Sequence, residues 1–140
     1  AKPVLKLKGD GANGAKMFTR ACALCHTHSG QGHAVGPDLT GLRNQPAATL
    51  LMHIIVPNHE VQGAYTLYEV DTRDNQTFAG LLAADTPEQI TLKLPLGLTK
   101  TLARKNIKTL RASPKSLMPD QLEKTMTKQE LADLLKFLKR

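Results

Sequence analysis

The stretch Cys22-Ala23-Leu24-Cys25-His26 carries the most specific chemical signal in this chain. It reads C-x-x-C-H, the attachment signature of a c-type haem. The two thiols can add to the two vinyl groups on one edge of the porphyrin. Residues three and four apart on a helical turn share one face, so Cys22, Cys25 and His26 can all point at one haem. The chain has two cysteines in all, and this motif uses both.

Three other interpretations of the same residues stay open. A disulfide or dithiol redox motif is one, although the βαβ context of thioredoxin-like proteins is missing. A zinc site completed by His28 or His33 is another, but structural zinc usually takes two spaced ligand pairs and there is no second cysteine pair. The third is a chance occurrence of the pattern. The sequence favours haem.

Composition is typical of one soluble domain with a modest core. The chain has 140 residues, of which 41% are hydrophobic and 22% charged. Aromatic residues make up only 4%, with no Trp, and a buried porphyrin would supply the missing apolar bulk. No apolar run is long enough to span a membrane. Because covalent haem attachment normally takes place outside the cytoplasm, we expect a periplasmic or otherwise exported protein whose signal peptide has been removed.

The pattern along the chain predicts a mainly α, cytochrome c-like fold around one haem in a single domain, residues 1–140. Residues 1–10 look like a basic lead-in. A first helix is expected to start near Asn13, a good N-cap residue, and to run into the haem motif. Residues 47–56 are apolar nearly all round, which predicts a short buried helix that ends at Pro57.

The last helix has a clear start signal. Thr127 and Glu130 are spaced as a capping box, in which each side chain accepts a hydrogen bond from a free backbone N–H group. The leucines that follow fall on one face, namely Leu131, Leu134, Leu135 and Leu138. We therefore expect an amphipathic helix packed on the core.

Residues 65–110 differ from the helical parts. Turn signals separate short runs, and Ile90, Leu92 and Leu94 alternate with polar residues, which is typical of half-buried antiparallel strands. We expect three to five strands in a small meander, inserted into the helical domain. The role of this insertion is not readable from its residues.

Two residues after the motif are candidates for haem contacts. A metal-bound histidine usually donates its second ring nitrogen to an acceptor that fixes the tautomer. The carbonyl of Pro37 is the candidate acceptor for His26, with a simple turn proline as the alternative. Arg43 is a candidate partner of a haem propionate, and a surface role is the alternative.

The sixth iron ligand is expected to be Met118. Haem iron in electron carriers is commonly held by His and Met, and Pro119 biases Met118 toward an extended backbone that suits a side chain reaching a metal. His53 and His59 are rival ligands. The other methionines are expected to be core, at positions 17, 52 and 126.

These motifs together resemble the class I cytochrome c order. The resemblance is closest to the haem-binding domain at the end of large planctomycete-type membrane-bound dehydrogenases, and it covers nearly the whole chain. It rests on Gly14-x-x-x-Phe18, Cys22-x-x-Cys25-His26, Gly36-Pro37-Asp38-Leu39, Val56-Pro57-Asn58, the strand segment, Ser113-Pro114-x-Ser116-Leu117-Met118-Pro119 and Leu131-Ala132-Asp133-Leu134-Leu135. It implies one covalent haem c, with His26 proximal and Met118 distal. One departure from this family is that no dehydrogenase part lies within these 140 residues, so both a free-standing carrier and a domain excised from a larger protein stay open.

The function expected from the sequence is electron transfer, without catalytic residues. The alternative is a haem enzyme or small-gas sensor with an open or labile sixth site. The formal charge is +7, and a run without Asp or Glu contains Lys93, Lys100, Arg104, Lys105, Lys108, Arg111 and Lys115. Such a rim would steer an acidic redox partner, with a dehydrogenase or terminal oxidase as candidates; a solvated strand face or neutralisation of the haem propionates is the alternative. Few aromatics and no recognised motif argue against nucleic-acid binding.

Overall fold

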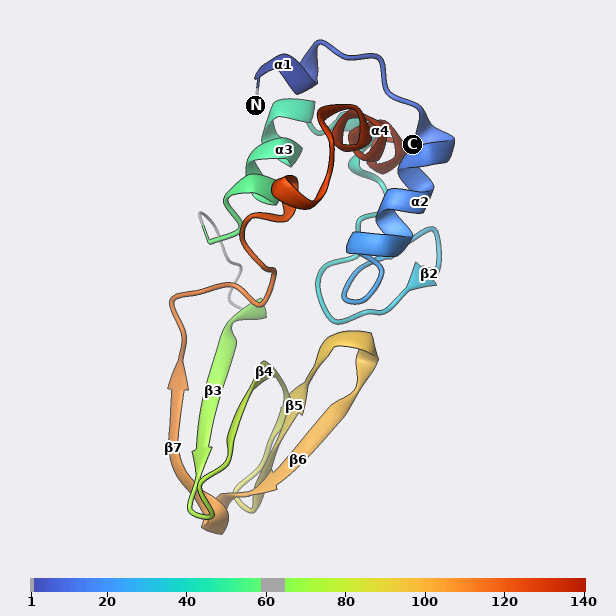
Figure 1. Ribbon diagram of the computed structural model, residues 1–140. Coiled ribbons are helices and arrows are strands. Elements are labelled where there is room, and N and C mark those ends of the chain that lie inside the picture. Colours follow the sequence, from blue (N-terminus) through green and yellow to red (C-terminus); the bar gives the residue numbers. More distant parts are fainter. Residues whose placement is uncertain (1, 59–64) are drawn as a thin grey trace.

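The computed structural model describes residues 2–58 and 65–140, with helices at one end and a sheet at the other (Figure 1). Both chain ends lie at the helical end. The helices are α1 (Lys2–Leu5), α2 (Gly11–Ala21), α3 (Ala47–Ile55) and α4 (Lys128–Leu138), with 3-10 turns η1 (Leu42–Asn44), η3 (Pro95–Gly97), η4 (Arg104–Asn106) and η5 (Leu122–Thr125). The strands are β1 (Thr27–His28), β2 (Gln31–Gly32), β3 (Leu67–Thr72), β4 (Thr77–Asp85), β5 (Gln89–Lys93), β6 (Thr99–Ala103) and β7 (Ile107–Ala112).

The prediction of a mainly α fold is wrong. Strands account for 27% of the structure and helices for 36%. Strands β3 to β7 form a five-stranded antiparallel sheet in the order β6-β5-β4-β3-β7, and β1 and β2 form a separate hairpin. The strand segment is therefore a substantial part of the fold, with its own sheet, rather than a small addition to a helical fold.

The sheet curls around a small core of its own. In a simple meander the last strand would lie beside β6, but β7 instead pairs with β3, at the other edge. All five strands contribute to one apolar cluster, centred on Val70, Ile90, Leu92 and Leu102. The predicted alternation is confirmed at Ile90 and Leu92, which are both fully buried.

Crossing of α2 and α4 organises the helical end. Phe18 of α2 packs with the leucine face of α4, and all four predicted leucines of that face are buried. The capping box is confirmed, because Thr127 accepts from the N–H of Glu130 and the Glu130 carboxylate accepts from the N–H of Thr127. In α3, Leu50, Leu51 and Ile54 face this core.

Helix α3 is less buried than its sequence suggested. Met52 is 47% exposed, and Val56, directly after the helix, is 42% exposed. Only one side of this short helix packs on α4 and its neighbours. None of the helices in the described residues is long and apolar enough to cross a membrane.

The start of α2 is set by a residue other than the predicted one. Asp10, not Asn13, is the N-cap, and its carboxylate accepts from the N–H groups of Ala12 and Asn13. Asn13 lies inside the first turn and donates its side-chain amide to Asp133 of α4 at 2.8 Å. Both residue types cap helices well, and the contact with α4 determines which of them does so.

Asp133 is the one acidic side chain buried in the described structure, with 2% of its surface exposed. Its carboxylate accepts hydrogen bonds from the backbone N–H of Asp10 at 2.7 Å and from the side chains of Asn13 and Gln129, both at 2.8 Å. Burial alone would raise the pKa of Asp133, but these hydrogen bonds outweigh it and hold the pKa below its usual value.

Replacement of Gly14 should disrupt the crossing of α2 and α4. A Cβ at Gly14 would lie 1.9 Å from the carbonyl oxygen of Asp133, which is backbone and cannot move aside. We expect Gly14→Ala to lower the free energy of unfolding by about 3 kcal/mol, measured by denaturant unfolding. Gly11→Ala is the matched control, because its Cβ meets only the mobile end of Arg140. Equal stability of the two variants would contradict this account.

The Asp133 carboxylate should make stability depend on acid pH. Its pKa is lower in the folded than in the unfolded chain, so its contribution is present above about pH 4 and is lost as the pH falls. Asp133→Asn should be less stable than wild type at pH 7 by about 1–3 kcal/mol. The gap between the two proteins should narrow toward pH 2 in urea titrations. The half-buried Asp71, whose pKa is also lowered, is present in both proteins, so its effect cancels in the comparison. A gap that is independent of pH would exclude this role.

Candidate haem-binding site

The Cys-x-x-Cys-His motif forms one further turn at the end of α2. Cys22 is the C-cap, and its N–H donates to the carbonyl of Phe18 at 2.8 Å. The N–H groups of Cys25 and His26 both donate to the carbonyl of Cys22, at 3.1 and 2.9 Å. The motif therefore has the helical turn geometry that brings residues three and four apart to one side.

The imidazole of His26 lies against Pro37, the predicted acceptor. Its Nδ1 is 2.7 Å from the carbonyl oxygen of Pro37. A carbonyl can only accept, so Nδ1 carries the proton and Nε2 presents a free lone pair. Burial lowers the pKa of His26, while the hydrogen bond to Pro37 acts in the opposite direction. The ring is thus neutral, oriented and able to coordinate a metal through Nε2.

Gly36 forms the wall behind this imidazole. A Cβ at Gly36 would lie 2.7 Å from Cε1 of His26, so only glycine allows the ring to sit this close to the chain. The loop is held in place by hydrogen bonds from the N–H groups of Val35 and Gly36 to the carbonyl of Cys25. Sequence reasoning missed this role, because a glycine before a proline signals only a turn.

The two thiols are free, and no disulfide joins them. Burial, with a smaller effect from Cys25, raises the pKa of Cys22 to about 11, and burial also raises the pKa of Cys25. Dithiol exchange and metal binding both use the thiolate, which these environments disfavour. Within the described residues, no group of three or more His, Cys, Asp or Glu side chains could hold a metal ion, so the zinc interpretation finds no ligand set there.

Met118 lies in the irregular segment between β7 and η5. It is partly buried and packs against the helical core cluster, as Cys22 does. Its N–H donates to Oγ of Ser116 at 3.1 Å, and the N–H of Ser116 donates to Oδ1 of Asn58 at 2.6 Å. The segment is therefore fixed to the end of α3. Of the rival ligands, His53 is exposed in α3, and His59 lies outside the described residues.

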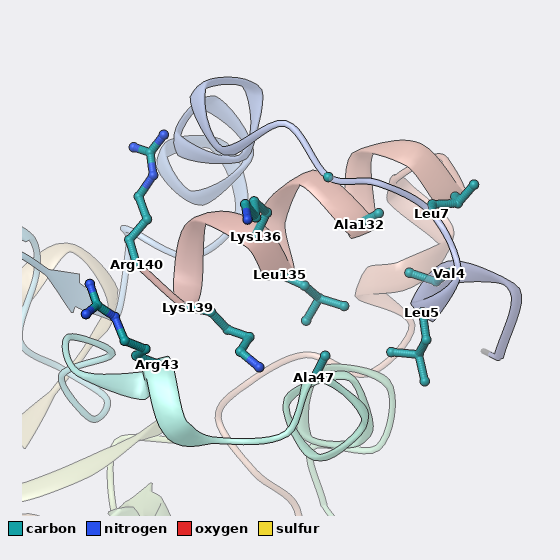
Figure 2. Close-up of a pocket in the computed structure, with 11 residues that line it drawn as sticks. Val4, Leu5, Leu7, Arg43, Ala47, Ala132, Leu135, Lys136, Lys139 and Arg140 are labelled. Carbon is teal, nitrogen blue, oxygen red and sulfur yellow. The ribbon is translucent and has the colours of Figure 1, made fainter.

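Arg43 lies apart from the other candidate site residues. It is exposed in η1 and lines an open pocket of about 400 Å³ between the N-terminal segment and α4 (Figure 2). Its neighbours at this rim include Lys136 of α4 and the two basic residues that follow this helix, Lys139 and Arg140. The pocket is not lined by Cys22, Cys25, His26, Pro37 or Met118. Binding of a haem propionate by Arg43 stays a prediction.

The basic run from Lys93 to Lys115 has fewer unpaired charges than its sequence suggested, because two of its arginines form ion pairs. Arg104 pairs with Asp85 of β4, and Arg111 pairs with Glu69 at 2.8 Å and Asp71 at 2.9 Å, both on β3. The carboxylates of these ion pairs belong to β3 and β4, outside the basic run, so the sequence of the run alone could not predict them. In the described structure, the other basic residues of the run form no ion pair, namely Lys93, Lys100, Lys105, Lys108 and Lys115.

The residues present fit a covalently attached haem. Two protonated thiols, unbonded to each other, and a neutral imidazole lie on one turn, and the imidazole is oriented by a carbonyl and seated against a glycine. No other arrangement of cysteine and histidine in the described residues offers the same set. This donor set is the one that thioether attachment and axial ligation require.

Comparison with known proteins agrees with a haem-binding site, and the match covers residues 11–91, more than half of the chain. A family model described as Cytochrome c matches residues 11–91. The chain is 46% identical over 39 residues to a Cytochrome c of Arabidopsis thaliana, covering 27% of this chain and 35% of that protein. It is 36% identical over 53 residues to a Cytochrome c-553-like protein of Synechocystis sp., covering 38% and 50%. The chain spans only about a third to a half of the length of these relatives.

Replacement of Gly36 should displace the imidazole of His26. The Cβ of Gly36→Ala would occupy the space of the ring, so we expect the hydrogen bond to Pro37 to break. The Nδ1–H resonance of His26 in an NMR spectrum of the purified protein should then shift or disappear. Gly30→Ala in the same loop is the control: its φ of 81° makes alanine locally strained by about 1 kcal/mol, but its Cβ meets nothing within 4 Å and so does not press on His26. An unchanged resonance in Gly36→Ala would show that the contact is not tight.

Proposed function

The chain belongs to the cytochrome c family and binds haem c covalently, and from that premise we propose that it is an electron carrier with His26 and Met118 as the two iron ligands. The observation that carries the proposal is the oriented imidazole, with Nδ1 2.7 Å from the carbonyl of Pro37 and Nε2 left free. A histidine held in this way is prepared to ligate a metal without taking up or releasing a proton. When bound, the haem supplies an iron that alternates between the ferric and ferrous states.

Each residue of the proposed site has one task. Cys22 and Cys25 tether the porphyrin through thioether bonds, and His26 ligates the iron on one side. Pro37 is a positioning residue, because its carbonyl keeps the His26 proton on Nδ1. Met118 would provide a thioether sulfur as the second iron ligand, and methionine ligation raises the reduction potential.

Met118 is supported as the second ligand by its surroundings. The segment around it has no regular structure, yet it is fixed through Ser116 and Asn58 and packs on the same apolar cluster as Cys22. Met126 also packs on this cluster, but it ends η5 immediately before the cap of α4. We assign it to the core.

We further propose an exported location and a redox-protein partner. The shared motifs described above favour the haem-binding domain of planctomycete-type dehydrogenases, and in that case a dehydrogenase is the electron donor. Lys93, which lies beside the cysteine loop and forms no ion pair in the described structure, favours a partner with an acidic surface. Electron-transfer complexes are typically small and short-lived, so charge steering matters more than extensive packing.

Absorption spectra test the ligand assignment. The ferric protein should be low-spin and six-coordinate, with a methionine-to-iron charge-transfer band. Met118→Ala should abolish this band and lower the reduction potential, because the soft sulfur ligand is lost. Met126→Ala is the matched control and should retain the band. A high-spin wild-type spectrum would instead support the haem enzyme or gas sensor, and a band that survives in Met118→Ala would contradict the distal assignment.

A further inference from the structure

The turn between β5 and β6 contacts the loop that carries the two cysteines. The N–H of Leu96 donates to the carbonyl oxygen of Leu24 at 2.7 Å. Nζ of Lys93 donates to the carbonyl oxygen of Ala34 at 3.0 Å. Figure 1 shows this turn, at the tip of the sheet, directly beside the loop that follows α2. The strand segment and the cysteine loop therefore form one continuous surface.

Exposed leucines gather on this surface. Leu24 is 46% exposed, Leu96 48% and Leu98 59%. They are three of the seven large apolar side chains that are exposed in the described part of the chain. A single exposed leucine is ordinary, but a group of them marks a contact surface.

The backbone conformation at Leu96 indicates that its side chain has a function at this surface. Leu96 has a φ of 67° and Gly97 a φ of 71°. A left-handed conformation costs a residue with a Cβ about 1 kcal/mol, and glycine adopts it freely. The chain nevertheless has leucine here, with its side chain 48% exposed. Strained residues of this kind cluster at functional surfaces.

The charge of this surface is one-sided. Neither the loop from residue 22 to 36 nor the hairpin from residue 92 to 104 contains Asp or Glu. Lys93 is tied to the loop through its Nζ, and Nζ of Lys100 lies 5.1 Å from the ring centroid of Phe78. Lys93 forms no ion pair in the described structure, whereas the charge of Lys100 also acts on Asp74 and helps to lower the pKa of that carboxyl group. The leucines are bordered by positive charge.

We propose that Leu24, Leu96 and Leu98 form the docking surface for the redox partner, a protein whose contact patch is apolar and bordered by carboxylates. The inference rests on the proposed electron-transfer function and assigns a role to the strand segment. Leu24 lies between the two attachment cysteines, so a partner seated here is close to the porphyrin edge. Apolar contact brings the two cofactors together, and Lys93 at the edge of this surface steers the approach.

A double variant at the turn tests this surface. Leu96→Asp with Leu98→Asp removes two apolar side chains and repels an acidic partner. Aspartate tolerates the left-handed backbone better than leucine, so the fold should be kept. Leu5→Asp with Leu7→Asp is the matched control, since both leucines are 40% exposed, lie on the N-terminal segment and give the same change in net charge.

The measurement is the second-order rate constant for electron transfer from a reduced, acidic blue-copper protein to the ferric protein, followed by stopped flow. The turn variant should react about tenfold more slowly than wild type, and the control by less than about twofold. Leu98→Asp alone, which leaves the backbone of Leu96 untouched, should give an intermediate rate. Added salt should slow wild type more than the turn variant.

Reduction by ascorbate separates the two proposals. A small reductant needs no protein docking surface, so wild type and both double variants should react with it at similar rates. If neither ascorbate nor the stronger reductant dithionite reduces wild type, the electron-carrier function fails. If ascorbate reduces all three proteins equally but the turn variant matches the Leu5/Leu7 control with the copper protein, the docking surface lies elsewhere and the inference is wrong.

Discussion

The position of the Cys-x-x-Cys-His motif depends on a backbone contact between α2 and α4 at Gly14. The absence of a Cβ lets the carbonyl of Asp133 approach α2, and the Asp133 carboxylate then accepts from Asp10 and Asn13 at the start of that helix. With its start fixed in this way, α2 ends at Ala21, and Cys22 closes its last turn. The position of the cysteine motif thus follows from a crossing that lies eight residues before it.

Features that depend on a few adjacent residues were predictable from the sequence. The capping box at Thr127 and Glu130, the leucine face of α4 and the alternation at Ile90 and Leu92 are all confirmed. Each is set by local hydrogen bonding or by the period of the chain. The start of α2 was not predictable in the same way, because Asp10 and Asn13 are both good caps and the choice between them is made by Asp133, 123 residues from Asp10.

The fold class was mispredicted for the same physical reason. Alternating residues indicate strands, but they do not indicate that β7 pairs with β3 and so encloses a separate core. Long-range contact also defines the candidate site. The carbonyl of Pro37 was predicted as the acceptor for His26, and the structure places Nδ1 of His26 2.7 Å from that carbonyl oxygen. The close contact between Gly36 and the imidazole was not predictable, because it exists only when the loop has folded back on the ring. Ligation by His26 and Met118 stays a prediction.

Pairing of β3 with β7 also decides how much positive charge that edge of the sheet carries. Glu69 lies directly opposite Arg111 in this pairing, and together with Asp71 it neutralises that arginine. A shift of one residue in the register would turn these side chains to opposite faces and break both ion pairs. At the other edge of the sheet, the tip of the β5–β6 hairpin has no carboxylate, and Lys93 forms no ion pair in the described structure. The register of β3 with β7 therefore removes positive charge from that edge, while Lys93 keeps its charge at the turn beside Leu24, where an approaching partner would meet it.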